Sequence, residues 1–223
     1  TIQAAADIEF DPAKAYNAAQ KVWSDDTGFT VYALNGPQAR AHFKEIAALR
    51  TSSFAGYPYL YAGTEEYEKE YLETYFNSFI GKVYLGFHHG KVVAFSNLIP
   101  LKDMSFEFQI PFIESNIDID NIMYLGEAIL APEYQHKKTH LINDILTIQE
   151  QYACEKHYKQ IVFMAVMRPD DHPQKPADYV SLDTMFIKFG FNQYENIFIQ
   201  ISWTQRDTSL ETDNILAVWQ KNL

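Results

Sequence analysis

Several features that mark other classes of protein are scarce in this chain. It has one cysteine among 223 residues, so it can form no disulfide within itself, which suits a reducing cytoplasm. No apolar run approaches the roughly 18 residues that span a bilayer, and the amino terminus lacks a charged-then-apolar signal pattern. We therefore expect a cytoplasmic protein that binds no membrane. Cys154 lies in a predicted helix, where we expect a small buried apolar side chain rather than a nucleophile.

Basic residues are also scarce. Lysine and arginine number 18 against 29 aspartates and glutamates, a formal net charge of −11. Nucleic-acid binders usually carry a basic face, so we expect no nucleic-acid partner. The local basic cluster is Lys137–Lys138, which disfavours broad polyanion binding but allows one small anion to bind. Aromatic residues are abundant instead, with 16 Phe, 15 Tyr and 3 Trp, and tyrosines often line pockets where one end stays polar.

Periodicity and turn residues predict a mixed fold of alternating strands and helices. Residues 1–27 resemble a small-residue, partly helical lead-in to a single domain over 1–223. The predicted elements that follow are a strand at 28–35, a helix opened by Gly36–Pro37, a helix capped by Thr64, a hairpin at 82–101, a short helix near Pro111, a strand at 122–130, a helix through Tyr152, a strand at 160–166, a short helix at 181–189, and strands at 196–203 and 214–220. The strand–helix–strand crossover at 122–166 implies two parallel strands in an otherwise antiparallel sheet.

The stretch "LGEAILAPEYQHKKTHLINDIL" at 125–146 joins a strand to a long helix through a turn without glycine. His136 and His140 are four residues apart and would share one face of a helix. The lysines between them repel a cation, and no third ligand is evident nearby, so we expect no metal here. The turn stands where a strand-to-helix connection can bind a small anion through its backbone amides.

Three features resemble the GNAT superfamily of N-acetyltransferases. They are a strand ending in "LAPEYQ" followed by a basic turn and a long helix, the segment "FIKFGF" at 186–191, and the order of the elements. The segments "YPYLY", "GEAIL", "RPDDHPQKPADYVSLD" and "ISWTQ" resemble a bacterial subgroup of that family, for which the resemblance implies no particular substrate. The resemblance implies an α+β fold, with a mixed, mostly antiparallel sheet of about seven strands and helices on both faces. It also implies transfer of an acetyl group from acetyl-CoA to an amine.

In that family the turn after the fourth strand reads Gln/Arg-x-x-Gly-x-Gly/Ala, and its amides bind the coenzyme A pyrophosphate. Gln135 takes the first position, whereas Lys138 and His140 replace the glycines and His136 stands where a further glycine is common. Side chains there carry a Cβ that can block a phosphate, while the two lysines add charge. The resemblance implies that coenzyme contacts come from Ile129, Leu130, Gln135, His136, Lys137, Lys138, Thr139 and His140.

The same resemblance suggests catalytic residues. Glu127 lies mid-strand among apolar neighbours, where a carboxylate is costly unless it has a partner or a role. It is the expected base that takes a proton from the amine, and burial would raise its pKa. The alternative is a Glu that faces outward or pairs with a lysine or arginine. The family's proton donor, a tyrosine, is replaced by Phe186, so Tyr179 is the candidate substitute, with loop packing as the alternative.

The acceptor is expected to be a small-molecule or peptide amine, and the acidic balance of the chain favours a cationic one. Tyr57, Tyr59 and Tyr61 lie where acceptor loops occur in the family, although they equally fit an aromatic lid packed on the core. Two functions therefore stay open. One is an acetyltransferase; the other is a binding protein that keeps the fold but has lost catalysis. A monomer or a homodimer is compatible with the sequence.

Overall fold

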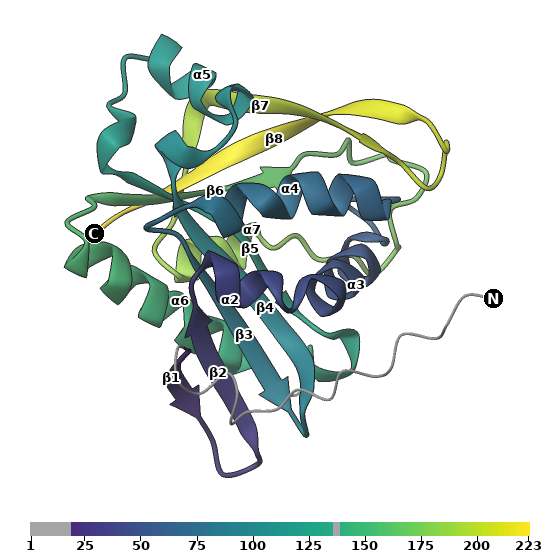
Figure 1. Ribbon diagram of the computed structural model, residues 1–223. Helices are drawn as coiled ribbons and strands as arrows, with labels where there is room; N and C mark the ends of the chain where they lie inside the picture. The colour runs from purple at the N-terminus through teal and green to yellow at the C-terminus, as the bar shows by residue number, and fades with distance from the viewer. Residues whose placement is uncertain (1–18, 136–138) are drawn as a thin grey trace.

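The computed structural model describes residues 19–135 and 139–223, in which one twisted sheet runs through the molecule (Figure 1). Its eight strands follow the order β1-β2-β3-β4-β5-β6-β8-β7. The strands are β1 (Gln20–Ser24), β2 (Phe29–Leu34), β3 (Lys82–His88), β4 (Lys91–Pro100), β5 (Ile122–Leu130), β6 (Gln160–Val166), β7 (Asn192–Thr204) and β8 (Glu211–Asn222). Every neighbouring pair is antiparallel except β5 and β6, which confirms the predicted mixed sheet.

The additional strand is β1, which lies where a partly helical lead-in was predicted. Residues 20–24 pair with β2 instead, through a register shift between Lys21 and Trp23. Val22 and Trp23 pack against the core, so tertiary contacts outweigh the weak local pattern. Residues 1–18 of the predicted lead-in lie outside the described residues. The sheet therefore has eight strands rather than about seven.

Six α-helices lie within the described residues, and Figure 1 shows them on both faces of the sheet. They are α2 (Gly36–Arg40), α3 (Phe43–Phe54), α4 (Glu65–Asn77), α5 (Phe106–Glu114), α6 (Thr139–Glu155) and α7 (Asp183–Lys188), with 3₁₀ turns η1 (Leu101–Asp103), η2 (Ile119–Asn121) and η3 (Pro132–Tyr134). The Thr64 hydroxyl accepts a hydrogen bond from the Tyr67 amide and caps α4, as predicted. None of the helices in these ranges is long and apolar enough to cross a membrane.

Three local expectations are wrong. The helix predicted after Gly36–Pro37 is divided, since α2 ends at Arg40 and α3 begins at Phe43. Helical spacing predicts that Phe79 continues the apolar stripe of the helix capped by Thr64, but Phe79 is fully exposed because α4 ends at Asn77. Cys154 is exposed rather than buried, because it lies on the outward side of α6 next to the buried Ala153.

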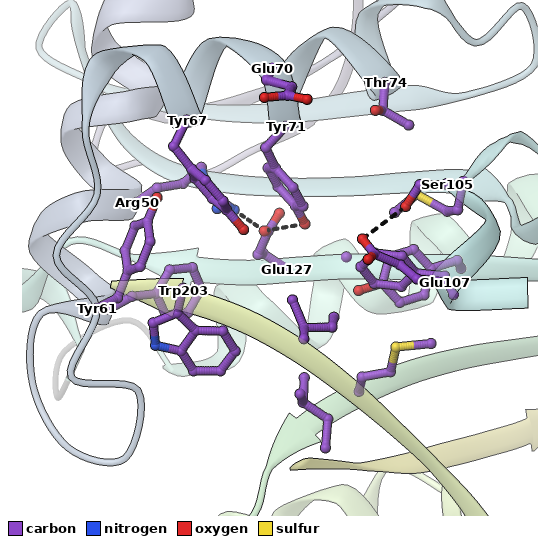
Figure 2. Close-up of a pocket in the computed structure, with 18 of the residues that line it drawn as sticks. Arg50, Tyr61, Tyr67, Glu70, Tyr71, Thr74, Ser105, Glu107, Glu127 and Trp203 are labelled. Carbon is purple, nitrogen blue, oxygen red and sulfur yellow. Dashed lines mark hydrogen bonds and ion pairs between the residues drawn. The ribbon is translucent and has the colours of Figure 1, made fainter. Parts of the chain in front are cut away.

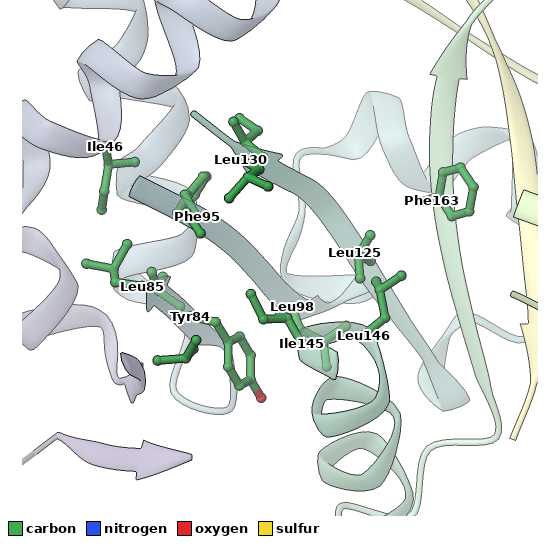
Figure 3. Close-up of a cluster of buried hydrophobic side chains, with 14 of the residues drawn as sticks. Ile46, Tyr84, Leu85, Phe95, Leu98, Leu125, Leu130, Ile145, Leu146 and Phe163 are labelled. Carbon is green, nitrogen blue, oxygen red and sulfur yellow. The ribbon is translucent and has the colours of Figure 1, made fainter. Parts of the chain in front are cut away.

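The core fills both sides of the central strands. Figure 3 shows Ile46 of α3 and Ile145 and Leu146 of α6 packed against the central strands β3, β4 and β5. Phe95 and Leu98 of β4 are fully buried between them. Burial of this kind stabilises a fold by about 25 cal/mol per Å² of apolar surface. The central strands β4 and β5 are therefore a rigid base for side chains that project from them.

The parallel pair β5–β6 is joined for only part of its length. Backbone pairing runs from Ile122–Gln160 to Tyr124–Val162 and then stops, although β5 continues to Leu130. Beyond that point β6 stays paired with β8, and β5 stays paired with β4. The two strands thus separate, and within residues 19–135 and 139–223 no strand pairs with the β6-facing edge of β5 from Leu125 onward.

Candidate active site

A β-bulge turns Glu127 towards helices α3 and α4. The pairing of β4 with β5 shifts register between Ser96 and Leu98, so Gly126 and Glu127 together oppose the single residue Asn97. A bulge of this type re-aims a side chain that would otherwise alternate to the opposite face. Gly126 fits the bulge because an added Cβ would lie 2.4 Å from both the Asn97 Oδ1 and the Tyr75 hydroxyl oxygen.

Glu127 is buried and accepts three side-chain hydrogen bonds. Its Oε1 accepts from the Tyr71 hydroxyl at 2.7 Å and also from the Arg50 guanidinium. Its Oε2 accepts from Asn97 Nδ2 at 2.7 Å, and the Asn97 Oδ1 accepts in turn from the Glu127 amide at 2.9 Å. Figure 2 shows the carboxylate between Arg50 and Tyr71. These donors fix the side chain and stabilise its charged form.

Arg50 lies between two carboxylates. Its Nε donates to Glu68 Oε2 at 2.7 Å while Nη1 pairs with Glu127, and all three side chains are at least 94% buried. The Arg50 guanidinium also lies 4.1 Å from the centre of the Tyr71 ring. Burial opposes its charge, but the electrostatic attraction of Tyr71 and Glu68 outweighs this and raises the pKa of Arg50 above its ordinary value. The Arg50 guanidinium is therefore shared by two buried carboxyl groups.

Tyrosines surround this cluster. The Tyr61 hydroxyl donates to Glu68 at 2.6 Å, and the Tyr71 and Tyr75 hydroxyls are 2.8 Å apart. Burial is the largest effect on these phenols: it raises the pKa of Tyr59 and of Tyr67 to about 12 and that of Tyr71 above its usual range. All of them therefore carry their protons near neutral pH and can donate hydrogen bonds.

The first of two cavities, here called the tyrosine cavity, has a volume of about 300 Å³. It lies beneath α3 and α4, and Figure 2 shows Tyr61, Tyr67, Tyr71 and Trp203 along its walls. Glu70 and Glu107 border it in addition to the Arg50–Glu127 pair. Its aromatic walls and carboxylates favour a ligand with a positive charge and an apolar body.

The second cavity, here called the apolar cleft, has a volume of about 170 Å³ and lies where β5 and β6 separate. Helices α6 and α7 close it on the far side, through Ile142, Leu146, Met185 and Phe186. Both cavities are bordered by Phe54, Tyr59, Gly126, Glu127 and Met164. A molecule in the apolar cleft and another in the tyrosine cavity would therefore meet beside Glu127.

Solved structures share the fold of this chain. An acetyltransferase of the GNAT family from Staphylococcus aureus Mu50 aligns over 88% of this chain and 99% of its own, with a TM-score of 0.56 and 15% identity. A ribosomal-protein-alanine N-acetyltransferase from Brucella melitensis aligns over 86% and 99%, with a TM-score of 0.55 and 13% identity. This chain has the GNAT fold. An N-acetyltransferase from S. aureus Mu50 gives a TM-score of 0.54 at 12% identity, over 87% of this chain and 98% of its own. No protein-family model and no curated protein matches the sequence.

Within this GNAT fold, the expected coenzyme residues lie on β5, in the turn that follows it and at the start of α6. Ile129 and Leu130 are buried on β5, at the part of the strand that has left β6. Gln135 donates from Nε2 to the Leu130 carbonyl at 3.1 Å, Thr139 begins α6, and His140 is exposed. His136, Lys137 and Lys138 lie outside the described residues. Among residues 19–135 and 139–223, no three His, Cys, Asp or Glu residues cluster as a metal site would require.

The predicted tyrosines do not all reach the two cavities. Tyr59 borders both cavities and Tyr61 borders the tyrosine cavity. Tyr57 and Tyr179 border neither, and their rings pack against each other with centroids 4.7 Å apart. The arrangement around Tyr179 is thus the loop packing that was its alternative, and a catalytic role for it stays an untested prediction.

Sequence reasoning missed the partners of Glu127. Arg50 recurs at helical spacing with Phe43 and Ile46, and an arginine on such an apolar face is a signal of a buried carboxylate. Asn97 follows the buried Ser96 in a strand, where a polar pair points to a special contact. Glu68 carried no signal, because its neighbours in α4 are also acidic. The sequence left two possibilities for Glu127, a buried base or a carboxylate paired with a lysine or arginine. In the structure Glu127 is both buried and paired with Arg50.

Proposed function

We propose that this protein is an N-acetyltransferase that moves the acetyl group of acetyl-CoA to an amine held in the tyrosine cavity. The observation that carries the proposal is that the two cavities meet at Glu127, where β5 and β6 separate. A thioester in the apolar cleft would place its carbonyl carbon near an amine on the other side. Holding both reactants at one point supplies much of the rate increase of such a transfer.

The described residues fit the pantetheine arm of the coenzyme. The unpaired edge of β5, which includes Ile129 and Leu130, offers backbone groups that an extended arm can pair with as an added strand. The walls of the apolar cleft are almost entirely apolar. The pyrophosphate contacts proposed for Gln135 to His140 include residues outside the described ranges, and there Lys137 and Lys138 would contribute charge.

The acceptor is proposed to be a small cationic molecule or peptide amine. The tyrosine cavity borders the carboxylates of Glu70, Glu107 and Glu127, whereas its one cation, among the described residues, is the already paired Arg50. The amine must be neutral when it attacks, so a group has to accept its proton. Glu127 is the proposed acceptor, directly or through water, since it is the carboxylate common to both cavities.

Calorimetric titration of the full chain with acetyl-CoA and with CoA, at moderate salt, tests this function. Binding of both is expected, accompanied by a rise in melting temperature, because a ligand that binds only the folded state stabilises it. If neither heat nor a thermal shift appears at ligand concentrations of about 1 mM, the affinity is too low for a coenzyme site. That outcome would leave a GNAT-fold binding protein without catalysis.

A further inference from the structure

The position of the expected proton donor is occupied by an apolar wall. The Phe186 ring packs against Phe163 and Trp219, with ring centroids 4.6 and 5.1 Å away, and it borders the apolar cleft. Tyr179 packs on Tyr57 away from both cavities. If the proposed transfer occurs, a proton donor for the sulfur that leaves the acetyl group therefore has to come from another element.

Two polar side chains are common to both cavities. Of the five residues that border both, Phe54, Gly126 and Met164 have no side-chain proton to give. Glu127 is a carboxylate that accepts from three donors, so it is poorly suited to donate. Tyr59 is the remaining polar residue, and its phenol is a proton donor at the junction.

The neighbouring tyrosines use their hydroxyls elsewhere. The Tyr61 hydroxyl donates to Glu68 at 2.6 Å and the Tyr71 hydroxyl donates to Glu127 at 2.7 Å. The Tyr59 hydroxyl instead lies near the backbone of Val166, on the strand that forms the other side of the split. Burial raises the pKa of Tyr59 to about 12, so the phenol is protonated throughout the physiological range.

Contacts from distant segments hold Tyr59 in this position. Its carbonyl oxygen accepts from Trp203 Nε1 at 3.1 Å and from Arg168 Nη2 at 3.3 Å. Its ring packs against Phe54, with centroids 4.7 Å apart. Such support keeps a donor in the geometry that proton transfer requires, at no cost during the reaction.

We propose that Tyr59 is the catalytic acid of the transfer, a role that rests on the proposed function and uses the hydroxyl at the junction of the two cavities. As the amine nitrogen bonds to the acetyl carbon, the C–S bond breaks and the Tyr59 hydroxyl gives its proton to the sulfur. The nitrogen loses one proton towards Glu127, and through water that proton returns to the Tyr59 oxygen. The nitrogen has then lost one proton and the thiol has gained one, so the exchange is balanced.

The test compares the full-length wild type with Tyr59→Phe, which keeps the ring and removes the hydroxyl. The probes are acetyl-CoA with 1,4-diaminobutane and with phenethylamine, and the amide product is quantified by mass spectrometry. Removing a general acid should lower kcat by about 10²- to 10⁴-fold, while calorimetry should show an acetyl-CoA Kd within about twofold of the wild type. The solvent deuterium isotope effect on kcat should also decrease in Tyr59→Phe, which a purely structural role would not cause.

Tyr194→Phe is the matched control, because that hydroxyl contacts Gln160 at 3.2 Å, away from both cavities. Its kcat should equal that of the wild type. Unchanged turnover in Tyr59→Phe, or a loss in Tyr179→Phe alone, would overturn the role of Tyr59 and leave the proposed function standing. A wild type that binds no acetyl-CoA and acetylates neither amine would contradict the proposed function, and the role of Tyr59 with it.

Discussion

The two cavities that meet at Glu127 differ in the residues that line them, which are charged and aromatic in one and mostly apolar in the other. The tyrosine cavity contains a buried ion cluster in which Arg50 joins Glu68 and Glu127, with phenols hydrogen-bonded around it. The apolar cleft is lined by aliphatic and aromatic side chains from α6, α7 and the separated strands. A single bulge on β5 supplies the carboxylate that both share. Apart from Glu127, the charged residues that border the cavities therefore belong to the tyrosine cavity.

This difference suggests that the two cavities bind different reactants. Charged and polar groups in a buried cavity interact strongly, because little water screens them, so the tyrosine cavity is suited to an amine and its proton. The apolar cleft offers few hydrogen bonds from side chains and is suited to the apolar part of a thioester. Separate changes to the two cavities should therefore have separate effects on proton transfer and on coenzyme affinity.

The largest effect is expected from Glu127→Gln. Gln keeps the shape and can still accept from Arg50, but it cannot accept the proton of the amine. Turnover should fall by about 10²- to 10⁴-fold while the Kd for acetyl-CoA changes little. Steady-state kinetics with a saturating amine, together with calorimetry, measure the two quantities.

Equal turnover in Glu127→Gln would remove Glu127 as the base. If the affinity of Glu127→Gln for acetyl-CoA falls as much as its turnover, the carboxylate contributes to coenzyme binding in the apolar cleft instead. Glu107→Gln is the control, because Glu107 borders only the tyrosine cavity, where it hydrogen-bonds to the Ser105 hydroxyl at 3.1 Å. That change should raise KM for a cationic amine and leave kcat close to the wild-type value.

Arg50→Met comes next and tests the ion cluster itself. Removing the cation leaves Glu68 and Glu127 buried without their shared partner, which should lower the free energy of unfolding by about 3–5 kcal/mol. Urea denaturation followed by circular dichroism measures the change. Arg40→Met is the control, because its pair with Glu73 is exposed, and a surface pair contributes at most about 1 kcal/mol. Equal losses in the two variants would contradict the special role of the buried cluster.

Local sequence signals predicted most of the fold because they depend on neighbouring residues. The hairpin, the crossover and the cap at Thr64 follow from turn residues, apolar runs and a side-chain oxygen at a helix start. Strand β1 was missed because five residues of weak pattern gain their stability from β2. Glu127 stood out as a lone carboxylate in an apolar strand. Its link to Arg50 spans 77 positions and could not be read from spacing.

Ala165→Leu tests the apolar cleft. Ala165 borders this cavity and not the other, so three added carbons should occupy space that the coenzyme arm needs. Acetyl-CoA affinity should weaken about tenfold, whereas the free energy of unfolding should change by no more than about 1–3 kcal/mol. Ala41→Leu, at an exposed position, is the matched control and should not alter affinity. If Ala165→Leu binds acetyl-CoA as tightly as the wild type, the coenzyme does not enter the apolar cleft.

The smallest effect concerns the phenols at high pH. Burial raises the pKa of Tyr67 to about 12, so its neutral form stabilises the fold below the unfolded pKa, and this contribution disappears as the pH rises towards the folded value. Between about pH 9 and about pH 11 the loss should be about 1 kcal/mol for this residue. Urea midpoints measured across this range should fall for the wild type relative to Tyr67→Phe as the pH increases. Parallel curves would contradict the burial of the Tyr67 phenol.

We propose above all that coenzyme and amine meet where β5 and β6 separate, between Glu127 and Tyr59. The most direct measurement is a crystal structure of the full chain with CoA. We expect the pantetheine arm in the apolar cleft, alongside Ile129 and Leu130, and the sulfur within hydrogen-bonding reach of the Tyr59 hydroxyl. A CoA molecule whose sulfur lies outside the split between the two strands would contradict it.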